Sequence, residues 1–286
     1  MAKQQIGILF PGQMGISVAA SAQNSGHAVH WTSEGRSSKT KDRASEHNLS
    51  DTGTLQALCE ASEILVCVCP PHAAEEVAAR VRAHAFRGKY LDANAIAPQR
   101  SIRIGQAMEA AGISFIDGGI VGGPAWEPGQ TWLYLSGECA GEVAGCFSAG
   151  PLETTVVGSE IGKASAIKMC YAAYTKGTTA LLSAILATAE QLGVRQELET
   201  QWSRDWPELP EQARRRARRV TAKAWRFAGE MGEISATFQQ AGVPGGFHAA
   251  AKEIYSRIAH FKGAPTEPAL EDVLRALSRT SDSNSD

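Results

Sequence analysis

The stretch GILFPGQMG, residues 7–15, decides how the first half of the chain folds. It matches the dinucleotide-binding pattern G-x-G-x-x-G with one glycine missing, because Gly12 and Gly15 fill the second and third positions while Phe10 stands at the first. The second glycine of the pattern lets the backbone approach a pyrophosphate, and the third lets the helix pack on the strand. Pro11 biases the altered first position toward a turn. Taken alone, the stretch is either a phosphate cradle or an ordinary strand–turn–helix.

Alternating strand and helix patterns surround this stretch and continue to about residue 157. The apolar run at 6–10 is typical of a buried parallel strand, and the alanine- and serine-rich segment 14–23 of a helix packed close to it. Further strands are expected at 27–33, 63–70, 89–98, 114–123, 131–137 and 153–158, with helices at 55–61, 73–86 and 100–112. This order predicts an α/β, Rossmann-like, doubly wound parallel sheet whose ligand lies beyond the carboxyl ends of the strands.

The second half of the chain has a helical pattern. A long helix is expected over 167–193, a second over about 211–241, a third over 247–261 and a short one over 269–277. We therefore divide the chain into a nucleotide-binding domain at 1–160, an all-α domain at 161–279 and a disordered tail at 280–286. The RRRARR cluster at 214–219 spreads over more than one helix face, which favours a solvated surface over a phosphate site.

Composition excludes several classes of protein. The 286 residues carry a formal net charge of −2, which gives no reason to expect a nucleic-acid partner. The sequence contains no apolar run approaching the roughly 18 residues that span a bilayer, so no membrane partner is expected. The six cysteines form no CxxC pair, which indicates reduced, buried thiols in a cytoplasmic protein and no metal site.

Four motifs in order resemble the β-hydroxyacid dehydrogenase and 6-phosphogluconate dehydrogenase superfamily, in a branch with its own helical C-terminal domain. FPGQMG (10–15) is similar to the family's G-x-G-x-M-G, and LDANAIAP (91–98) to D-x-S-T-x-x-P with Asn94 in place of serine. DGGIVGGP (117–124) is similar to the substrate loop D-x-P-V-S-G-G, with Gly119 replacing proline and Val121 replacing serine. GKASAIKMCYA (162–172) is similar to G-x-G-x-x-x-K-x-x-x-N, with Ala172 in place of asparagine. Because the other three motifs occur in the family's order, the stretch GILFPGQMG is interpreted as a phosphate cradle.

The resemblance implies a nicotinamide cofactor. A carboxylate after the second strand would bind the ribose of NAD, whereas a positive cluster would accept the extra phosphate of NADP. The segment TSEGRSSKT (32–40) offers both, and its arginine, hydroxyls and lysine favour NADP, with NAD as the alternative. The expected cofactor-binding residues are Pro11, Gly12, Gln13, Met14, Gly15, Glu34, Arg36, Ser37, Lys39, Cys69, Pro70 and Asn94. The amide of Asn94 either orients the nicotinamide or substrate or stabilises its own turn.

The substrate side of the site is expected in the glycine-rich loop and on the long helix. The glycines Gly118, Gly119, Gly122 and Gly123 let backbone N–H groups converge on a small anion, or the loop is simply a tight crossover. The residues of this loop expected to bind substrate are Gly119, Val121, Gly122 and Gly123. The resemblance implies that Lys168 is the catalytic lysine. Tyr171 and Thr175, the latter expected to contact substrate, fall on the same helical stripe, whereas Lys176 lies about 80° around the helix. The expected catalytic residues are Lys168, Tyr171 and Asn94.

These motifs predict an NADP-dependent oxidoreductase acting on a small hydroxy acid or a related hydroxy or carbonyl compound, with the lysine as general acid and base. The alternatives are C=N reduction, as in imine reductases of similar architecture, and a non-catalytic nucleotide-binding module. Apolar residues on several faces of the long helix, together with the resemblance, predict a homodimer formed by the helical half.

Overall fold

The computed structural model describes residues 2–278, so the predicted tail at 280–286 lies outside the described residues. The chain divides into two compact units, residues 1–169 and 170–286. The division falls inside the long helix α7 (Lys163–Gln191). The sequence patterns placed the boundary at residues 160 and 161, just before this helix.

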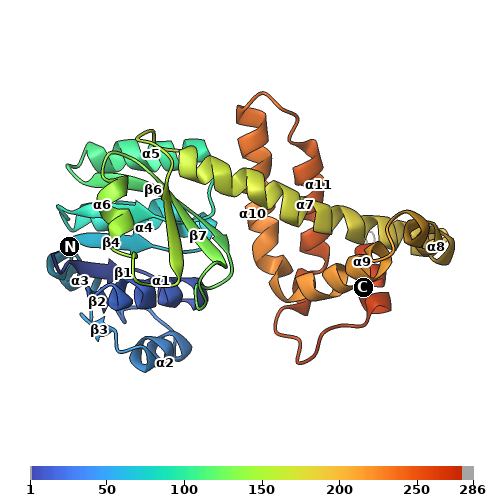
Figure 1. The fold of residues 1–286 in the computed structure, drawn as a ribbon, viewed down its shortest axis with the longest axis horizontal. Coiled ribbons are helices and arrows are strands. Elements are labelled where there is room, and N and C mark those ends of the chain that lie inside the picture. The colour runs from blue at the N-terminus through green and yellow to red at the C-terminus, as the bar shows by residue number, and fades with distance from the viewer. Residues whose placement is uncertain (1, 279–286) are drawn as a thin grey trace, which may run out of the picture. The chain divides into compact units, whose positions relative to one another are not determined.

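The first unit is built on an eight-stranded sheet with the order β3-β2-β1-β4-β5-β6-β7-β8 (Figure 1). Its strands are β1 (Gln5–Ile8), β2 (Ala28–Trp31), β3 (Ser50–Asp51), β4 (Ile64–Cys67), β5 (Lys89–Asp92), β6 (Ser114–Gly122), β7 (Thr131–Ser136) and β8 (Leu152–Val156). The expected doubly wound sheet is confirmed. Only the β6–β7 pair is antiparallel, because the short loop 123–130 can reverse the chain but is too short for a parallel crossover.

Helices cover both faces of this sheet. One face packs against α1 (Gln13–Asn24), α2 (Ser38–Glu46) and α6 (Ala140–Gly145). The other packs against α3 (Leu55–Ala61), α4 (Ala74–Ala83) and α5 (Pro98–Glu109). The central strands between these layers are almost fully buried, as in β4 (ILVC), whose continuous hydrophobic run is typical of a buried parallel strand, whereas the edge strands β3 and β8 are largely exposed.

Two helices of the first unit, α2 and α6, were not predicted from the sequence. The α2 sequence SKTKDRASE buries only Ala44, so it carries no apolar stripe that would identify a helix. It begins where Ser37 accepts a hydrogen bond from the backbone N–H of Thr40, as an N-cap residue does. The polar loop after β2 is therefore shorter than predicted and runs directly into a helix.

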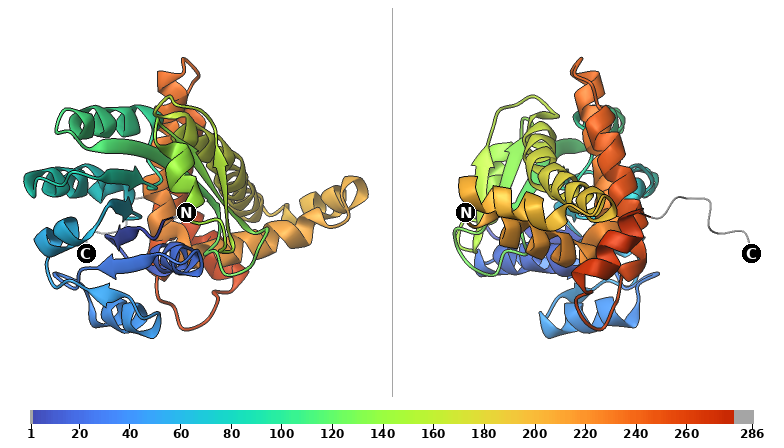
Figure 2. Two further views of the ribbon diagram at one scale, coloured as in Figure 1. Left: turned by 60° about the vertical axis from the view of Figure 1, so that its left-hand side comes forward. Right: turned by 90° about the vertical axis from the view of Figure 1, so that its right-hand side faces the viewer.

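The second unit consists of the remainder of α7 and shorter helices. These are α8 (Arg195–Asp205), α9 (Leu209–Arg219), the 3₁₀ turn η2 (Val220–Lys223), α10 (Ala224–Gln240), α11 (Gly246–Arg257), the 3₁₀ turn η3 (Ala259–Phe261) and α12 (Leu270–Ser278). Helices α10 and α11 lie side by side (Figures 1 and 2). Although α7 has 29 residues, no helix within residues 2–278 is both long and apolar enough to cross a membrane.

The single helix predicted over 211–241 is wrong, because η2 separates α9 from α10. The segment between the first two predicted helices, for which no helix was expected, also differs, since most of it forms α8. This helix buries none of its own residues, so the hydrophobic periodicity that identifies a helix is missing there.

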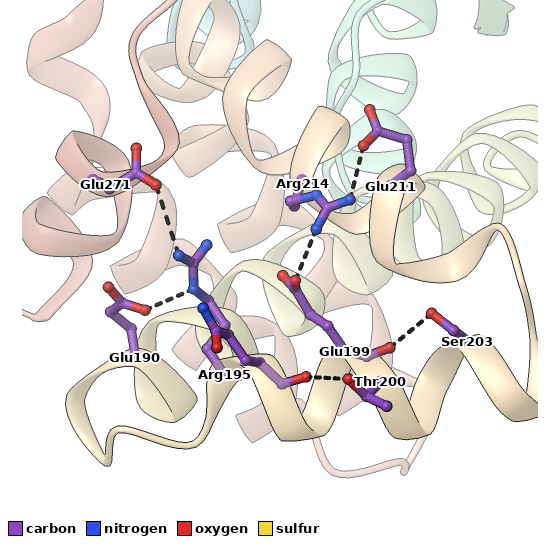
Figure 3. A network of polar contacts seen from close by, with 9 residues as sticks. Glu190, Arg195, Glu199, Thr200, Ser203, Glu211, Arg214 and Glu271 are labelled. Carbon is purple, nitrogen blue, oxygen red and sulfur yellow. Dashed lines mark hydrogen bonds and ion pairs between the residues drawn. The ribbon is translucent and has the colours of Figure 1, made fainter.

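Ion pairs attach α8 to its neighbours. Figure 3 shows that the pairs join Arg195 to Glu190 and Glu271, and Arg214 to Glu199 and Glu211. The chain elements that they connect are α7, α8, α9 and α12. Because α8 lacks an apolar face, its attachment to the neighbouring helices depends in part on this network of ion pairs.

The arginine cluster at 214–219 forms the solvated surface that its sequence favours only in part, because Arg215 and Arg219 are exposed while the other three arginines bind neighbouring segments. Besides Arg214, Arg216 donates to the hydroxyls of Thr178 and Thr179 and to the carbonyl of Thr175, all on α7. Arg218 donates to the carbonyl of Pro268, before α12. Three arginines at alternate positions of α9 thus reach three different neighbouring segments and hold α9 among them.

Candidate cofactor and catalytic site

The segment between β1 and α1 is the candidate phosphate cradle, called the cradle below. The N-terminus of α1 lies at Gln13, its N-cap is Gly12, and its first turn contains no acidic residue. A Cβ built on Gly12 would meet nothing within 4 Å, which leaves open space beside the helix N-terminus. A Cβ on Gly15 would lie 2.0 Å from the carbonyl oxygen of Phe10, so the helix start packs directly on the loop. Both features fit a bound pyrophosphate, which helix N-terminal N–H groups and the helix dipole favour.

Arginines from the segment after β2 brace this cradle. The Arg36 guanidinium lies 3.9 Å from the centroid of the Phe10 ring and donates to the carbonyl of Leu9 over 3.0 Å. Arg43, on α2, donates to the carbonyl of buried Pro11 over 3.3 Å. Phe10 therefore replaces the first glycine of the pattern with a platform on which a cation stacks.

A small hollow adjoins the cradle. It is lined by Leu9, Phe10, Thr32, Glu34, Arg36, Leu55, Val77 and Arg80. Burial and the nearby positive charge of Arg80 lower the pKa of Arg36. Among the described residues, the Nε atom of Arg36 is buried without a hydrogen-bond partner. Two guanidiniums beside one carboxylate leave this hollow with an excess of positive charge that suits an anionic group.

The other predicted residues after β2 have different positions. The Glu34 carboxylate accepts a hydrogen bond from the N–H of Leu55, at the start of α3, and lies 3.8 Å from the Arg80 guanidinium. The Ser37 hydroxyl caps α2, and Lys39 is exposed on that helix. Of the expected set, Glu34 and Arg36 line the hollow, while Ser37 and Lys39 do not. Sequence reasoning missed Arg80, because a single arginine on the exposed side of α4 gives no local signal.

The carboxyl ends of β4 and β5 are joined by Asn94. Its side-chain oxygen accepts a hydrogen bond from the backbone N–H of Cys69, and its Nδ2 group donates to the sulfur of Cys67 over 3.4 Å. Asn94 is only 2% exposed, so its amide holds the end of β4 in place. Cys69 is buried as well, and Pro70 after it is exposed at the start of the short 3₁₀ turn η1 (Pro71–Ala73).

Asp92 lies beneath Asn94 as a buried acid. Its Oδ1 atom accepts the backbone N–H of Asn94 over 3.0 Å, and its Oδ2 atom has no hydrogen-bond partner among the described residues. Burial, with a smaller contribution from Cys67, raises the pKa of Asp92 well above its usual range. Burial thus disfavours the charged form of this carboxyl group.

Lys168 lies on the part of α7 that packs along β6. A Cβ built on Gly119 would lie 2.4 Å from the carbonyl oxygen of Ala164 and 3.0 Å from the Cβ of Lys168. Gly119, the residue that replaces the family's proline, thus permits the helix to approach the strand closely. Val121 is buried further along β6. The structure thus brings together two motifs that are almost fifty residues apart in the chain, since the backbone of Lys168 lies beside Gly119.

The glycines after β6 differ from each other. Gly122 has a φ of +116°, a conformation that side chains rarely adopt, and it packs against Thr131. A Cβ on Gly123 would meet nothing within 4 Å. The predicted crossover role therefore applies to Gly122, while the surroundings of Gly123 leave room for a ligand.

Tyr171 and Thr175 lie in the second unit. Tyr171 is 49% exposed, and the Thr175 hydroxyl donates to the carbonyl of Tyr171. The neighbouring Lys176 is buried in an ion pair with Glu230, while the hydroxyl of Tyr255 donates to the carbonyl of Lys176. Burial lowers the pKa of Lys176 and Glu230 opposes that effect, so this lysine is engaged inside its own unit.

Comparison with known families agrees with the geometry of the first unit. Residues 5–138 match the model described as the NAD binding domain of 6-phosphogluconate dehydrogenase. Residues 189–258 match a domain of unknown function, DUF1932. An uncharacterised 28.5 kDa protein of Methanothermus fervidus is 29% identical over 166 residues, which are 58% of this chain and 63% of that protein. The chain thus matches less than two thirds of this relative's length.

Solved structures share the fold over nearly the whole chain. The 3-hydroxyisobutyrate dehydrogenase of Mycobacterium tuberculosis with L-serine is 16% identical, with 97% of this chain and 100% of that one covered at a TM-score of 0.71. A reductive aminase of Aspergillus terreus in complex with NADPH and ethyl levulinate is 17% identical, with 96% and 99% covered at a TM-score of 0.58. At such identities, the likeness establishes the fold.

Proposed function

We propose that this chain, whose residues 5–138 match the family model of the NAD binding domain of 6-phosphogluconate dehydrogenase, transfers hydride between NADP and a small hydroxy acid or related hydroxy or carbonyl compound. The enzyme class, an NAD(P)-dependent dehydrogenase or reductase, follows from this family. The observation that carries the proposal is the open N-terminus of α1 beside Gly12, with Lys168 on the helix that packs along β6.

Each residue has a distinct task in this proposal. The nicotinamide, when bound, supplies the hydride acceptor or donor. The N–H groups at Gln13, Met14 and Gly15 bind the pyrophosphate, as a helix N-terminus does. Asn94 keeps the end of β4 in place. Lys168 takes the hydroxyl proton during oxidation and returns it to the nascent alkoxide during reduction.

The preference for NADP rests on the hollow next to the cradle. Arg36 and Arg80 both line it, and their charges exceed that of Glu34. Glu34 is already engaged with the N–H of Leu55 and with Arg80, so its carboxylate is less available to ribose hydroxyls than an unengaged one. A phosphate monoester would pair with both guanidiniums in charge-assisted hydrogen bonds.

Arg36→Ala is expected to weaken NADPH binding by roughly 1.5–3 kcal/mol, the range of a charge-assisted contact. Arg80→Ala is expected to weaken NADPH with little effect on NADH, because Arg80 does not brace the cradle. Arg36 contacts Phe10 and Leu9, so its loss also carries a smaller cost for NADH. Fluorescence titration with each cofactor measures both effects.

Arg82→Ala is the matched control, because Arg82 is exposed on the same helix as Arg80 and does not line the hollow. It is expected to bind both cofactors as the unchanged protein does. Equal losses of NADH and NADPH in Arg80→Ala would contradict the phosphate role. If the unchanged protein preferred NADH, Glu34 would instead be the residue that determines the cofactor, by binding the ribose hydroxyls.

The reaction itself is tested by following NADPH absorbance with a panel of hydroxy acids, carbonyl compounds and imines in both directions. Turnover of hydroxy acids or their carbonyl forms supports the proposal. Reduction of C=N bonds is the second candidate, favoured by the fold shared with the reductive aminase. Lys168 argues for the carbonyl substrate, because a lysine beside the reacting carbon can return a proton to a nascent alkoxide. Cofactor binding without turnover across the panel would favour a nucleotide-binding module.

We also propose a homodimer formed mainly by the helical unit. On α7, Tyr171, Tyr174 and Leu181 are 49%, 72% and 43% exposed and follow a helical spacing, so they form an apolar stripe. Light scattering at micromolar concentration is expected to give twice the chain mass of 30.4 kDa. A mass near that of one chain would exclude the dimer.

A further inference from the structure

Asp117, on β6, is a buried carboxylate that the proposed reaction does not use. It is 0% exposed. Its Oδ1 atom accepts from the hydroxyls of Ser101 (2.8 Å) and Ser165. Its Oδ2 atom accepts from the hydroxyl of Ser136 (3.1 Å) and from the backbone N–H groups of Gly162 and Ser165 (3.0 Å each). In all five hydrogen bonds the carboxylate is the acceptor, which is the pattern of its ionised form.

These donors place the charge at the N-terminus of α7. Gly162 precedes the first helical residue, and Ser165 lies in the first turn. The hydroxyl of Ser136 donates to Asp117 and also accepts the N–H of Ala164 over 3.2 Å. A carboxylate that binds first-turn N–H groups satisfies donors that the helix cannot, and its charge is stabilised by the helix dipole.

Two contacts along β6 fix α7 at successive turns. Asp117 holds the turn that contains Ser165, and Gly119, on the same face of the strand, lies so close to α7 that a Cβ there would meet the carbonyl oxygen of Ala164 and the Cβ of Lys168. Lys168 lies three residues after Ser165, on the same side of the helix. The helix cannot rotate or slide along the strand without breaking the hydrogen bonds of the carboxylate, so the place of Lys168 depends on them.

We infer that Asp117 is a positioning residue that sets the location of the Lys168 amine by fixing the first turn of α7. The functional meaning of this inference rests on the proposed role of Lys168. The placement itself does not, because it can be measured on the lysine without turnover. Ser101 bonds the same carboxylate from α5 and provides the comparison that separates positioning from stability.

The test is the acetylation rate of Lys168 in the folded, full-length protein without cofactor, quantified on peptides by mass spectrometry. Lys41, exposed on α2, is the internal reference. In Asp117→Asn, one of the two acceptor oxygens becomes an NH₂ donor and the negative charge at the first turn of α7 is lost, so that turn is held less firmly. The ratio of Lys168 to Lys41 acetylation is expected to change by at least about threefold, while NADPH binding stays within about twofold.

Ser165→Ala is expected to change the ratio in the same direction but by less, and it decides the question if Asp117→Asn does not fold. Ser101→Ala is expected to lower the melting temperature and leave the ratio unchanged. An unchanged ratio in a folded Asp117→Asn or, failing that, in Ser165→Ala would overturn the inference, as would an equal change in Ser101→Ala. Failure of the proposed function would give a different result. Lys168→Gln would then keep its turnover, while the acetylation ratio of Lys168 to Lys41 would still change in Asp117→Asn and Ser165→Ala.

Discussion

Lys168→Gln is expected to lower turnover on the true substrate by at least about a hundredfold, the lower limit for losing a positioned general acid or base. Glutamine keeps much of the side-chain length and polarity but cannot exchange a proton near neutral pH. NADPH affinity and the melting temperature are expected to stay close to those of the unchanged protein. Stopped-flow or steady-state absorbance of NADPH measures the rate.

Lys163→Gln is the matched control on the same helix. Lys163 is exposed and pairs only across the surface with Glu160, and such a pair contributes about 0–1 kcal/mol. Its turnover is expected to be unchanged. Near-normal turnover of Lys168→Gln would show that the lysine does not carry the proton, and imine reduction with another proton donor would become the better interpretation.

Features encoded by neighbouring residues were predicted well from the sequence. The turn around Gly12 and Gly15, the apolar strands and the long helix α7 each depend on local spacing and local hydrophobicity. The proximity of the Gly119 loop to Lys168 followed from the order of the motifs and their resemblance to a family, and the packing of α7 on β6 agrees with it. Local pattern and family order therefore carried most of the fold and the outline of the site.

Features held by distant contacts could not be predicted. Helices α2 and α8 bury one residue and none, respectively, so no periodic stripe marks them. The hydrogen-bond partners of Asp117 come from positions 101, 136, 162 and 165, and their spacing along the chain does not predict that they meet at one carboxylate. Arg80 shows the same limit, because it becomes a candidate only when α4 brings it beside Glu34.

The departure at Phe10 acquires a physical reason only in the structure. A glycine at this position would leave Arg36 without the ring over which its guanidinium lies. With Phe10, the cradle is linked to the hollow where a second phosphate is proposed to bind. The missing glycine and the proposed choice of cofactor are thus connected through one arginine, which contacts the loop on one side and lines the hollow on the other.

Gly15→Ala is expected to lower the free energy of unfolding by about 2–3 kcal/mol, since overpacking at a buried site costs this much. The new Cβ would lie 2.0 Å from the Phe10 carbonyl oxygen, which also accepts the N–H of Gly12. Either α1 or the loop must move, and both shape the cradle. NADPH and NADH are therefore expected to bind at least about tenfold more weakly, in contrast to the selective loss in Arg80→Ala.

Two further glycine substitutions separate the causes of this effect. Gly12→Ala places its Cβ in open space, so it is expected to keep the stability of the fold and to weaken both cofactors by occupying the cradle. Gly141→Ala, on α6, also meets nothing within 4 Å and is expected to change neither cofactor affinity, with a stabilisation of up to about 1 kcal/mol. Chemical denaturation and cofactor titration measure the set. If Gly15→Ala bound NADPH within twofold of the unchanged protein, the helix start would not be the pyrophosphate site, because a displaced helix N-terminus cannot keep its N–H groups aligned on the same anion.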